Sequence, residues 1–204
     1  MKSVKWIIGI DEVGRGPIAG PVYVCAVAMP RAAYRAAKWR EGGALLTDSK
    51  QMTASARERW EKEARAMEQE GKLRIAVASR SAAMIDRCGI APCIRSCVAS
   101  ALRRLGLDPK DCEVLLDGSL SAPKEYAHQT TVIRGDSVHK IISLASVVAK
   151  VRRDAQMTRL AAQHPHYGWE ENKGYGTAAH YRGIAKSGLT PLHRNTFLNR
   201  YLTQ

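Results

Sequence analysis

Acidic residues are scarce in this sequence. Against 32 Lys and Arg stand only 19 Asp and Glu, so the 204-residue chain has a formal net charge of +13. A positive surface gains free energy by releasing the counterions condensed on phosphates, and we therefore expect a nucleic-acid partner. A generally basic protein without such a partner is the alternative that the charge alone leaves open.

Long hydrophobic runs are also missing. No stretch approaches the ~20 apolar residues that a membrane span needs. The first apolar run, residues 6–10, is followed at once by Asp11 and Glu12, which is unlike a secretory signal. We therefore expect a cytoplasmic protein with no membrane partner. A monomer is favoured, and the sequence indicates no particular protein partner.

Cysteines are few and odd in number, which argues against a disulfide framework. They lie mostly in apolar surroundings, at positions 25, 88, 93, 97 and 112. Cys93 and Cys97 share a helix face and could join Cys88 as zinc ligands, but no histidine lies nearby and no second cysteine pair matches. We expect reduced, buried thiols that pack in the core.

Low-complexity linkers and internal repeats are absent as well. A chain of this length can bury one sizeable core, so we expect a single domain over residues 1–204. Hydrophobic patterning predicts strands at 5–11, 22–29, 73–79, 113–116 and 129–133. It predicts helices at 31–40, 55–70, 92–105 and 140–162, followed by one that Thr177 caps. The order, a hairpin and then strand–helix–strand units, predicts an α/β fold with a mixed sheet flanked by helices.

Several local signals refine the predicted helices. Ser55 begins a capping-box pattern and predicts the start of the second helix. Glu61 and Arg65 lie one turn apart on that helix and are interpreted as part of a solvated face. Pro92 is predicted to begin the following amphipathic helix, which Gly106 ends.

Acidic residues stand where three separate apolar strands end. Asp11 and Glu12 follow the first strand, whereas Asp117 and Asp136 follow two later ones. Taken singly, Asp117 and Asp136 could equally be turn or capping residues. Together, four carboxylates at neighbouring strand ends repel one another unless cations compensate, and oxygen ligands alone select Mg²⁺ or Mn²⁺. Two such ions suit the hydrolysis of a phosphodiester.

A series of motifs resembles that of bacterial ribonuclease HII, the type 2 ribonuclease H. The motifs occur in the family's order and cover nearly the whole chain: GIDEVGRGPIAGP (9–21), LTDSK (46–50), LLDGS (115–119), IRGDS (133–137), ASVVAKVRRD (145–154), HYGWEENKGYGT (166–177) and TPLHRNTF (190–197). The resemblance implies a ribonuclease H-like mixed sheet flanked by helices, with a helical C-terminal portion from about residue 165.

The resemblance also assigns roles. It implies four catalytic metal ligands, Asp11, Glu12, Asp117 and Asp136. It implies that a turn recognises the ribonucleotide at an RNA-to-DNA junction, and this turn consists of Gly14, Arg15 and Gly16. A bare glycine backbone there can hydrogen-bond the 2′-hydroxyl, the group that distinguishes RNA from DNA. Tyr175 matches the tyrosine that packs on the next sugar.

Further residues are candidates for substrate binding. The resemblance suggests that Asp48, Ser49 and Lys50 lie in a loop that approaches the nucleic acid. Lys50, Lys150 and Arg194 are candidate phosphate contacts, with solvated surface cations as the equal alternative. Asp154 is interpreted as a structural carboxylate paired with a basic neighbour. A general base could be imagined at His193, but we interpret it as a structural hydrogen-bonding residue.

We therefore expect a metal-dependent endoribonuclease that uses Mg²⁺ or Mn²⁺. Its expected substrates are RNA–DNA hybrids, whose RNA strand it hydrolyses, and DNA duplexes containing ribonucleotides, which it incises 5′ of the ribonucleotide in ribonucleotide excision. The expected products carry 3′-hydroxyl and 5′-phosphate ends. The alternative is a non-catalytic hybrid-binding protein that retains the fold.

Overall fold

The structure, a computed structural model, describes residues 4–41 and 44–202. Its centre is a five-stranded mixed sheet in the order β5-β2-β1-β6-β7. The β1–β2 and β2–β5 pairs are antiparallel, and the β1–β6 and β6–β7 pairs are parallel. The strands are β1 (Trp6–Val13), β2 (Val22–Pro30), β5 (Arg74–Arg80), β6 (Cys112–Asp117) and β7 (His128–Val132). A separate pair is formed by β3 (Arg40–Glu41) and β4 (Ala44–Leu45).

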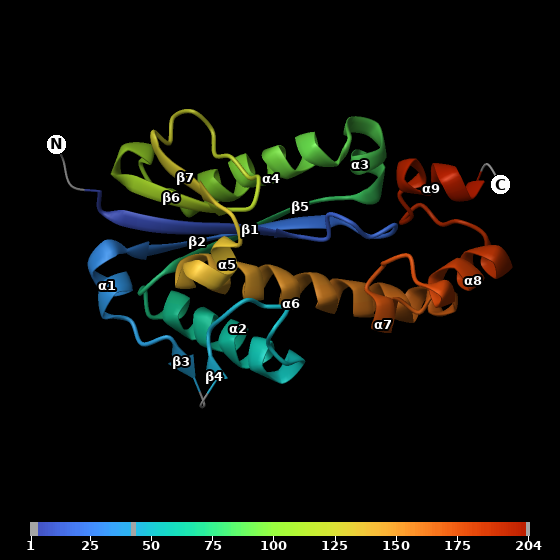
Figure 1. The fold of residues 1–204 in the computed structure, drawn as a ribbon, viewed down its shortest axis with the longest axis horizontal. Helices are drawn as coiled ribbons and strands as arrows, with labels where there is room; N and C mark the ends of the chain where they lie inside the picture. Colours follow the sequence, from blue (N-terminus) through green and yellow to red (C-terminus); the bar gives the residue numbers. More distant parts are fainter. Residues whose placement is uncertain (1–3, 42–43, 203–204) are drawn as a thin grey trace.

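Helices cover both faces of this sheet, which confirms the predicted α/β class (Figure 1). One face carries α3 (Ala82–Cys88) and α4 (Ile90–Leu105), and the other carries α2 (Ala54–Gln69) and α6 (Lys140–Gln163). Alternation along β1 places Ile8 and Ile10 in the core under α4 and Ile7 in the core under α6. Gly9 also faces α6, so closely that a Cβ there would lie 2.4 Å from the carbonyl carbon of Ile141.

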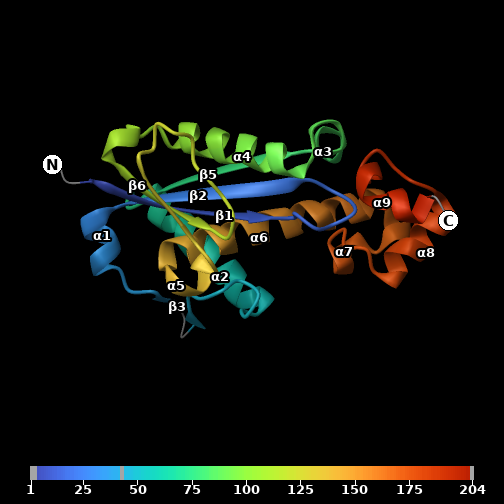
Figure 2. The same cartoon turned by 45° about the horizontal axis from the view of Figure 1, so that its top comes forward.

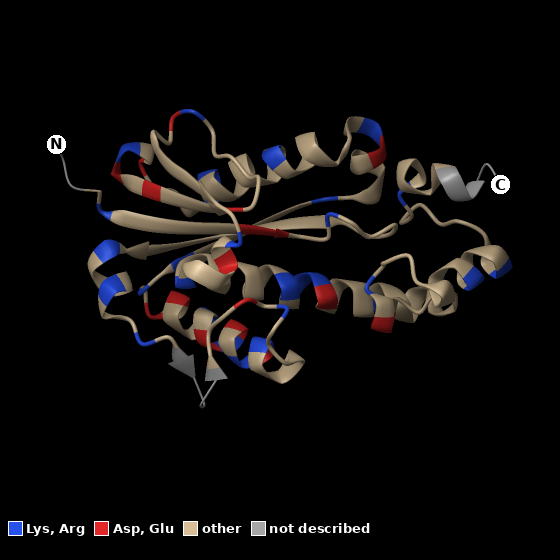
Figure 3. Ribbon diagram, in the orientation of Figure 1, with Lys and Arg blue, Asp and Glu red and all other residues tan. Residues whose placement is uncertain are grey.

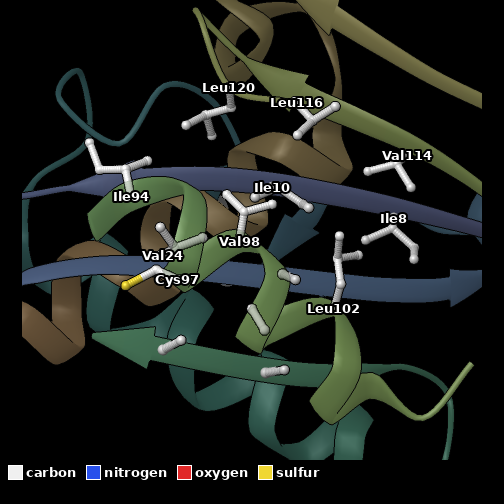
Figure 4. Packing of buried hydrophobic residues seen from close by; sticks show 14 of the residues in the cluster. Ile8, Ile10, Val24, Ile94, Cys97, Val98, Leu102, Val114, Leu116 and Leu120 are labelled. Atoms are coloured by element: carbon white, nitrogen blue, oxygen red, sulfur yellow. The ribbon is translucent and has the colours of Figure 1, made fainter. Parts of the chain in front are cut away.

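The α4 face is packed by the apolar stripe that the sequence shows (Figure 4). Gly106, with φ +65°, ends the helix as predicted. The helix begins at Ile90, two residues before Pro92, which therefore lies in its first turn instead of starting it. Cys93 and Cys97 are buried in this core, as the packing interpretation predicted.

The remaining cysteines divide by position. Cys25 and Cys112 are buried, whereas Cys88 is exposed, contrary to the expectation that the thiols are buried. In the described part of the chain, the group of side chains that could hold a metal contains no cysteine. Core packing is thus the role that the structure gives to the buried thiols.

The start and the exposure of α2 differ from prediction. Thr53, not Ser55, caps the helix, because its Oγ1 accepts a hydrogen bond of 3.2 Å from the amide of Ala56. Glu61 is only 6% exposed, so its interpretation as part of a solvated face was wrong. Its carboxylate pairs with Arg65 at 2.6 Å and with Arg152 at 3.5 Å, because α2 packs against α6.

Short helices surround these layers. The predicted helix at 31–40 is shorter, α1 (Arg31–Ala36), and the strand β7 leads into α5 (Gly135–Val138). A 3-10 turn, Pro109–Asp111, precedes β6.

The C-terminal part is helical and lies beyond the end of the sheet (Figure 2). It contains a 3-10 turn (Pro165–Tyr167), α7 (Trp169–Asn172), α8 (Ala178–Ser187) and α9 (Asn195–Leu202). As predicted, Thr177 caps α8, accepting a 3.3 Å hydrogen bond from the amide of His180. No helix among the described residues is long and apolar enough to cross a membrane.

Candidate active site

Three carboxylates from three elements meet beside the carboxyl-terminal ends of β1 and β6. Asp11 lies in β1, Asp117 ends β6, and Asp136 lies in the first turn of α5. Each offers one oxygen, and these oxygens all lie within 4.8 Å of one another. Because β1 and β6 are parallel neighbours, Asp11 and Asp117 lie near the same, carboxyl-terminal end of the two strands. Figure 3 shows acidic segments of β1 and α5 close together in the middle of the molecule.

A tight backbone turn holds Asp136 in place. After β7, Arg134 adopts the left-handed conformation with φ 53°, and the chain enters α5. The Gly135 amide donates a 2.6 Å hydrogen bond to Oδ1 of Asp117. A Cβ at Gly135 would lie 2.6 Å from Cδ1 of Ile142, so a larger residue there would require the end of the Ile142 side chain to move. Asp136 was expected to follow its strand directly, and the structure places it one short turn later.

Burial controls the charge of the cluster. Asp11 is 6% exposed, and burial, reinforced by the charges of Glu12 and Asp117, raises its pKa to about 8. Burial and then the charges of Asp117 and Asp48 also raise the pKa of Asp136. Carboxylates that resist ionisation together gain most from a cation that neutralises them. The donors are all hard oxygens, so the residues fit Mg²⁺ or Mn²⁺.

Glu12 lies beside this cluster but outside the group of three. Because β1 continues to Val13, the Glu12 side chain starts on the opposite face from Asp11. Burial raises the pKa of Glu12, the charge of Arg15 lowers it, and the charge of Asp117 raises it. The Arg15 guanidinium lies 3.6 Å from the Glu12 carboxylate. Glu12 thus links the acidic cluster to the turn that follows it.

Ser49 lies behind the carboxylates and away from the surface. It is 4% exposed, and its Oγ is 2.8 Å from Oγ of Ser146 on α6. The Ser146 hydroxyl is hydrogen-bonded to Asp11, which favours the charged form of that carboxylate. The expectation that Ser49 contacts substrate is therefore corrected: it supports Asp11 through Ser146. Ser146 was missed, and a serine in an otherwise apolar helix stretch was the available signal.

Lys50 lies where it was expected, in an exposed loop near the acidic cluster. Its charge lowers the pKa of Asp136, against the larger effects that raise it. Asp48 in the same loop hydrogen-bonds to Asp136. The sequence interpretation had placed Asp48 in this loop without giving it a part in the cluster.

The turn after β1 and Tyr175 lie next to each other. Gly14, Arg15 and Gly16 follow the strand, and Arg15 is exposed, with its Nη1 3.2 Å from Oγ of Ser119. Tyr175 is 45% exposed, so its ring is accessible from solvent. A Cβ at Gly16 would lie 3.9 Å from Cε1 of Tyr175, which is ordinary contact distance. The structure therefore brings together the two features that the sequence placed 159 residues apart, at positions 16 and 175.

Two candidate phosphate contacts have other partners. Arg194 is 0% exposed, and its guanidinium donates to backbone carbonyls, so both the predicted phosphate contact and the alternative of a solvated surface cation were wrong. Arg194 cannot reach a substrate phosphate because the segment before α9 packs under the turn after β1 and buries its side chain. Lys150 is half-buried, and its Nζ lies 2.9 Å from Oδ1 of Asp154. Asp154 is thereby paired with a basic neighbour, as interpreted.

His193 is structural, as interpreted. It is 1% exposed, and its Nδ1 accepts a 2.9 Å hydrogen bond from the Thr190 amide. Burial, followed by the charge of nearby His180, lowers the pKa of His193 to about 4. A neutral, enclosed imidazole of this kind holds the C-terminal helices together.

Comparison with known proteins decides the family. The model of the Ribonuclease HII family matches residues 8–201. The chain belongs to the ribonuclease HII family. This confirms the resemblance drawn from the motif series. Ribonuclease HII of Gluconobacter oxydans is 44% identical over 191 residues, which cover 94% of this chain and 87% of that protein. Ribonuclease HII of Thermosynechococcus vestitus is 40% identical over 196 residues, covering 96% and 85%.

Solved structures share the fold of this ribonuclease HII family member. Ribonuclease HII from the complex with PCNA of Archaeoglobus fulgidus matches with a TM-score of 0.70 and 23% identity, covering 92% of this chain and 93% of that one. A Bst-RNase HIII in complex with Mn²⁺ matches with a TM-score of 0.66 and 18% identity, covering 98% and 69%. The ribonuclease H-like architecture that the resemblance implied is confirmed.

Membership of the ribonuclease HII family makes the chain an enzyme, a divalent-metal-dependent ribonuclease H that acts on RNA–DNA hybrids. The acidic cluster and its all-oxygen donor set agree with this dependence.

Proposed function

We propose that this chain incises DNA duplexes on the 5′ side of embedded ribonucleotides, in addition to hydrolysing the RNA strand of hybrids. It acts as a single-domain monomer with Mg²⁺ or Mn²⁺, and its products carry 3′-hydroxyl and 5′-phosphate ends. The observation that carries the proposal is the cluster of three carboxylates next to an exposed glycine turn and Tyr175. That arrangement places a hydrolytic centre next to a surface that can recognise a single ribose.

Asp11, Asp117 and Asp136 are the residues that would hold the metal, with Glu12 beside them. When bound, two divalent cations lower the pKa of the attacking water and stabilise the leaving oxygen. The protein contributes fixed geometry: Gly135 holds Asp117, and Ser146 holds Asp11. Because the carboxylates are anchored by hydrogen bonds, little reorganisation is needed when substrate arrives.

The turn and the tyrosine supply the selectivity. In the turn of Gly14, Arg15 and Gly16, the exposed backbone of Arg15 and Gly16 can hydrogen-bond the 2′-hydroxyl of a ribonucleotide. The ring of Tyr175 can pack on the next sugar and disfavour a 2′-hydroxyl there. Exposed Lys50 next to Asp136 is placed to contact a phosphate.

The proposal is tested with a labelled DNA duplex that contains one ribonucleotide, incubated with Mg²⁺ or Mn²⁺. Wild type should cut on its 5′ side, and Asp11→Asn should lower the rate about a hundredfold or more, because a buried ligand and its charge are lost. Asp111→Asn is the matched control, since Asp111 pairs with Lys5 outside the cluster. An intact duplex with wild type and both metals would refute ribonucleotide incision. Equal rates for wild type and Asp11→Asn would refute the assigned site and support a contaminating nuclease.

A further inference from the structure

Two arginines are buried beneath the turn after β1 without a direct ion pair, although the charges of Asp154 and Asp86 act on Arg153 and Arg194 respectively. Arg153 on α6 and Arg194 before α9 are each 0% exposed. Among the side chains that the structure describes, no carboxylate oxygen lies within 4.0 Å of either guanidinium. A buried charge is costly unless hydrogen bonds satisfy it. The contacts that do so are all with backbone carbonyls.

Arg194 fixes the direction of the peptide groups in the turn. Its Nη2 donates to the Gly14 carbonyl at 2.7 Å and its Nη1 to the Arg15 carbonyl at 3.0 Å. In a planar trans peptide the carbonyl and the following N–H point in opposite directions. Capturing these two carbonyls therefore turns the amides of Arg15 and Gly16 outward. Both residues are exposed, and neither amide donates to another described residue.

Arg153 ties the rest of this loop to the segment that carries Tyr175. Its Nε donates to the Pro21 carbonyl at 3.0 Å and its Nη2 to the Ala19 carbonyl at 3.3 Å. Its Nη1 donates to the Lys173 carbonyl at 2.9 Å, two residues before the tyrosine. One guanidinium thus spans two segments that are remote in sequence.

Direct backbone contacts complete the connection. The Gly174 carbonyl accepts hydrogen bonds from the amides of Ile18 and Ala19 at 2.9 and 3.1 Å. A Cβ at Gly174 would lie 2.4 Å from the Ala19 carbonyl oxygen, and its φ is +87°. The loop after β1 and the Tyr175 segment therefore approach as closely as bare backbone allows.

We propose that Arg153 and Arg194 are positioning residues that lock the Gly14–Gly16 turn and Tyr175 into one rigid sensor for a ribonucleotide joined to DNA. The inference rests on the proposed function. Neither arginine touches substrate. They hold two outward amides ready for the 2′-oxygen and keep the tyrosine at a fixed distance from them. A preorganised donor pair loses less entropy on binding than a mobile loop does, so the clamp raises selectivity.

The test compares binding of two DNA duplexes that differ only in one ribonucleotide. Dissociation constants are measured by fluorescence anisotropy in EDTA, where no hydrolysis occurs. Arg194→Lys keeps the charge but replaces a three-donor fork with one compact ammonium. We expect it to reduce the preference for the ribonucleotide duplex about threefold to tenfold, the effect of weakening one hydrogen bond. Its affinity for the all-DNA duplex should change less than about twofold.

Arg74→Lys is the matched control. Arg74 also donates to a backbone carbonyl, that of Leu105 at 2.8 Å, but it lies in β5 at the opposite edge of the sheet from β7. It should keep the wild-type preference. Gly174→Ala is the second variant, because it forces the two segments apart without changing any charge. It should lose the preference as Arg194→Lys does, and it carries the test alone if Arg194→Lys does not fold.

The outcomes separate the inference from the proposed function. A folded Arg194→Lys or Gly174→Ala protein, by circular dichroism, with the full wild-type preference overturns the inference. Equal binding of both duplexes by wild type, with cleavage at the ribonucleotide retained, also overturns the inference but leaves the proposed function standing. Failure of wild type to cleave at the ribonucleotide overturns the proposed function itself.

Discussion

Asp11 is almost fully enclosed, and burial raises its pKa from 3.8 to about 8. In the metal-free protein this carboxyl is therefore mostly protonated at pH 7. A metal ion binds the carboxylate form, so binding must displace the proton. The unfolded chain ionises near pH 3.8 and the folded chain near pH 8, so the free energy of unfolding of the metal-free protein falls between these values as pH rises.

Metal binding should consequently release about one proton at pH 7 and almost none above pH 9. Titration calorimetry with Mn²⁺ in two buffers of different ionisation enthalpy measures this number. Mn²⁺ affinity should rise with pH up to about pH 8. Asp11→Asn should remove the proton release, and Asp111→Asn should keep it. If wild type releases no proton on Mn²⁺ binding at pH 7, Asp11 is not protonated in the metal-free protein at that pH.

Among single residues, the sequence identified the carboxylates but not what supports them. Asp11, Asp117 and Asp136 stand after apolar strands, which is visible in the sequence. Ser49 and Arg194 were expected at the surface, and both are buried. Charge and hydrogen-bonding capacity are properties of a residue, whereas burial depends on which other elements cover it.

The elements follow local patterning closely. The predicted strand at 22–29 and helix at 140–162 agree with β2 and α6 to within one residue at each end. Helix starts at which two neighbouring residues could each act as the N-cap were less predictable. Either hydroxyl can satisfy a free amide at a helix start, and in the structure Thr53, not Ser55, caps α2.

The contact between β1 and α6 positions the site, and Gly9 permits it. We expect Gly9→Ala to lower the free energy of unfolding by about 3 kcal/mol, because the new Cβ would lie 2.4 Å from Ile141 backbone that cannot easily move. Urea denaturation measures the loss. Activity should fall with it, since Asp11 lies two residues further along β1.

Gly71→Ala is the comparison for this prediction. Gly71 has φ +71°, and a Cβ added there would have no atom of the described residues within 4 Å beyond its chain neighbours. The change therefore costs only backbone strain of about 1 kcal/mol. Activity should be unchanged. If the two variants are equally stable, close approach of the backbones is not the reason for Gly9.

The whole molecule joins a two-sided sheet to a helical C-terminal part. That part is held by a buried aromatic cluster in which Trp169 donates to His180 at 2.9 Å and His180 lies 3.1 Å from His193. Burial lowers the pKa of both histidines. The cluster is therefore stable only while both imidazoles are neutral.

The contribution of His193 to stability should fall as pH falls from 6.5 to about 4, because unfolded His193 takes up a proton in this range and folded His193 does not. The loss amounts to about 3 kcal/mol at 1.36 kcal/mol per pKa unit. Urea denaturation of wild type and His193→Gln across this range measures it as a difference: as pH falls, wild type should lose stability relative to the variant. Asp11 acts in the opposite direction in both proteins and cancels in the comparison. His128→Gln, at an exposed position on β7, should keep the wild-type slope.

The sequence by itself determined the basic charge, the strands and main helices, the acidic residues at strand ends and the family. These follow from local periodicity and from motif order, which are written along the chain. Only the tertiary structure decided that Arg153 and Arg194 lie beneath the Gly14–Gly16 turn, that Ser49 supports Asp11, and that Glu61 is buried. Each of these depends on contacts between segments remote in sequence, and no local pattern encodes which polar residue such a contact will enclose.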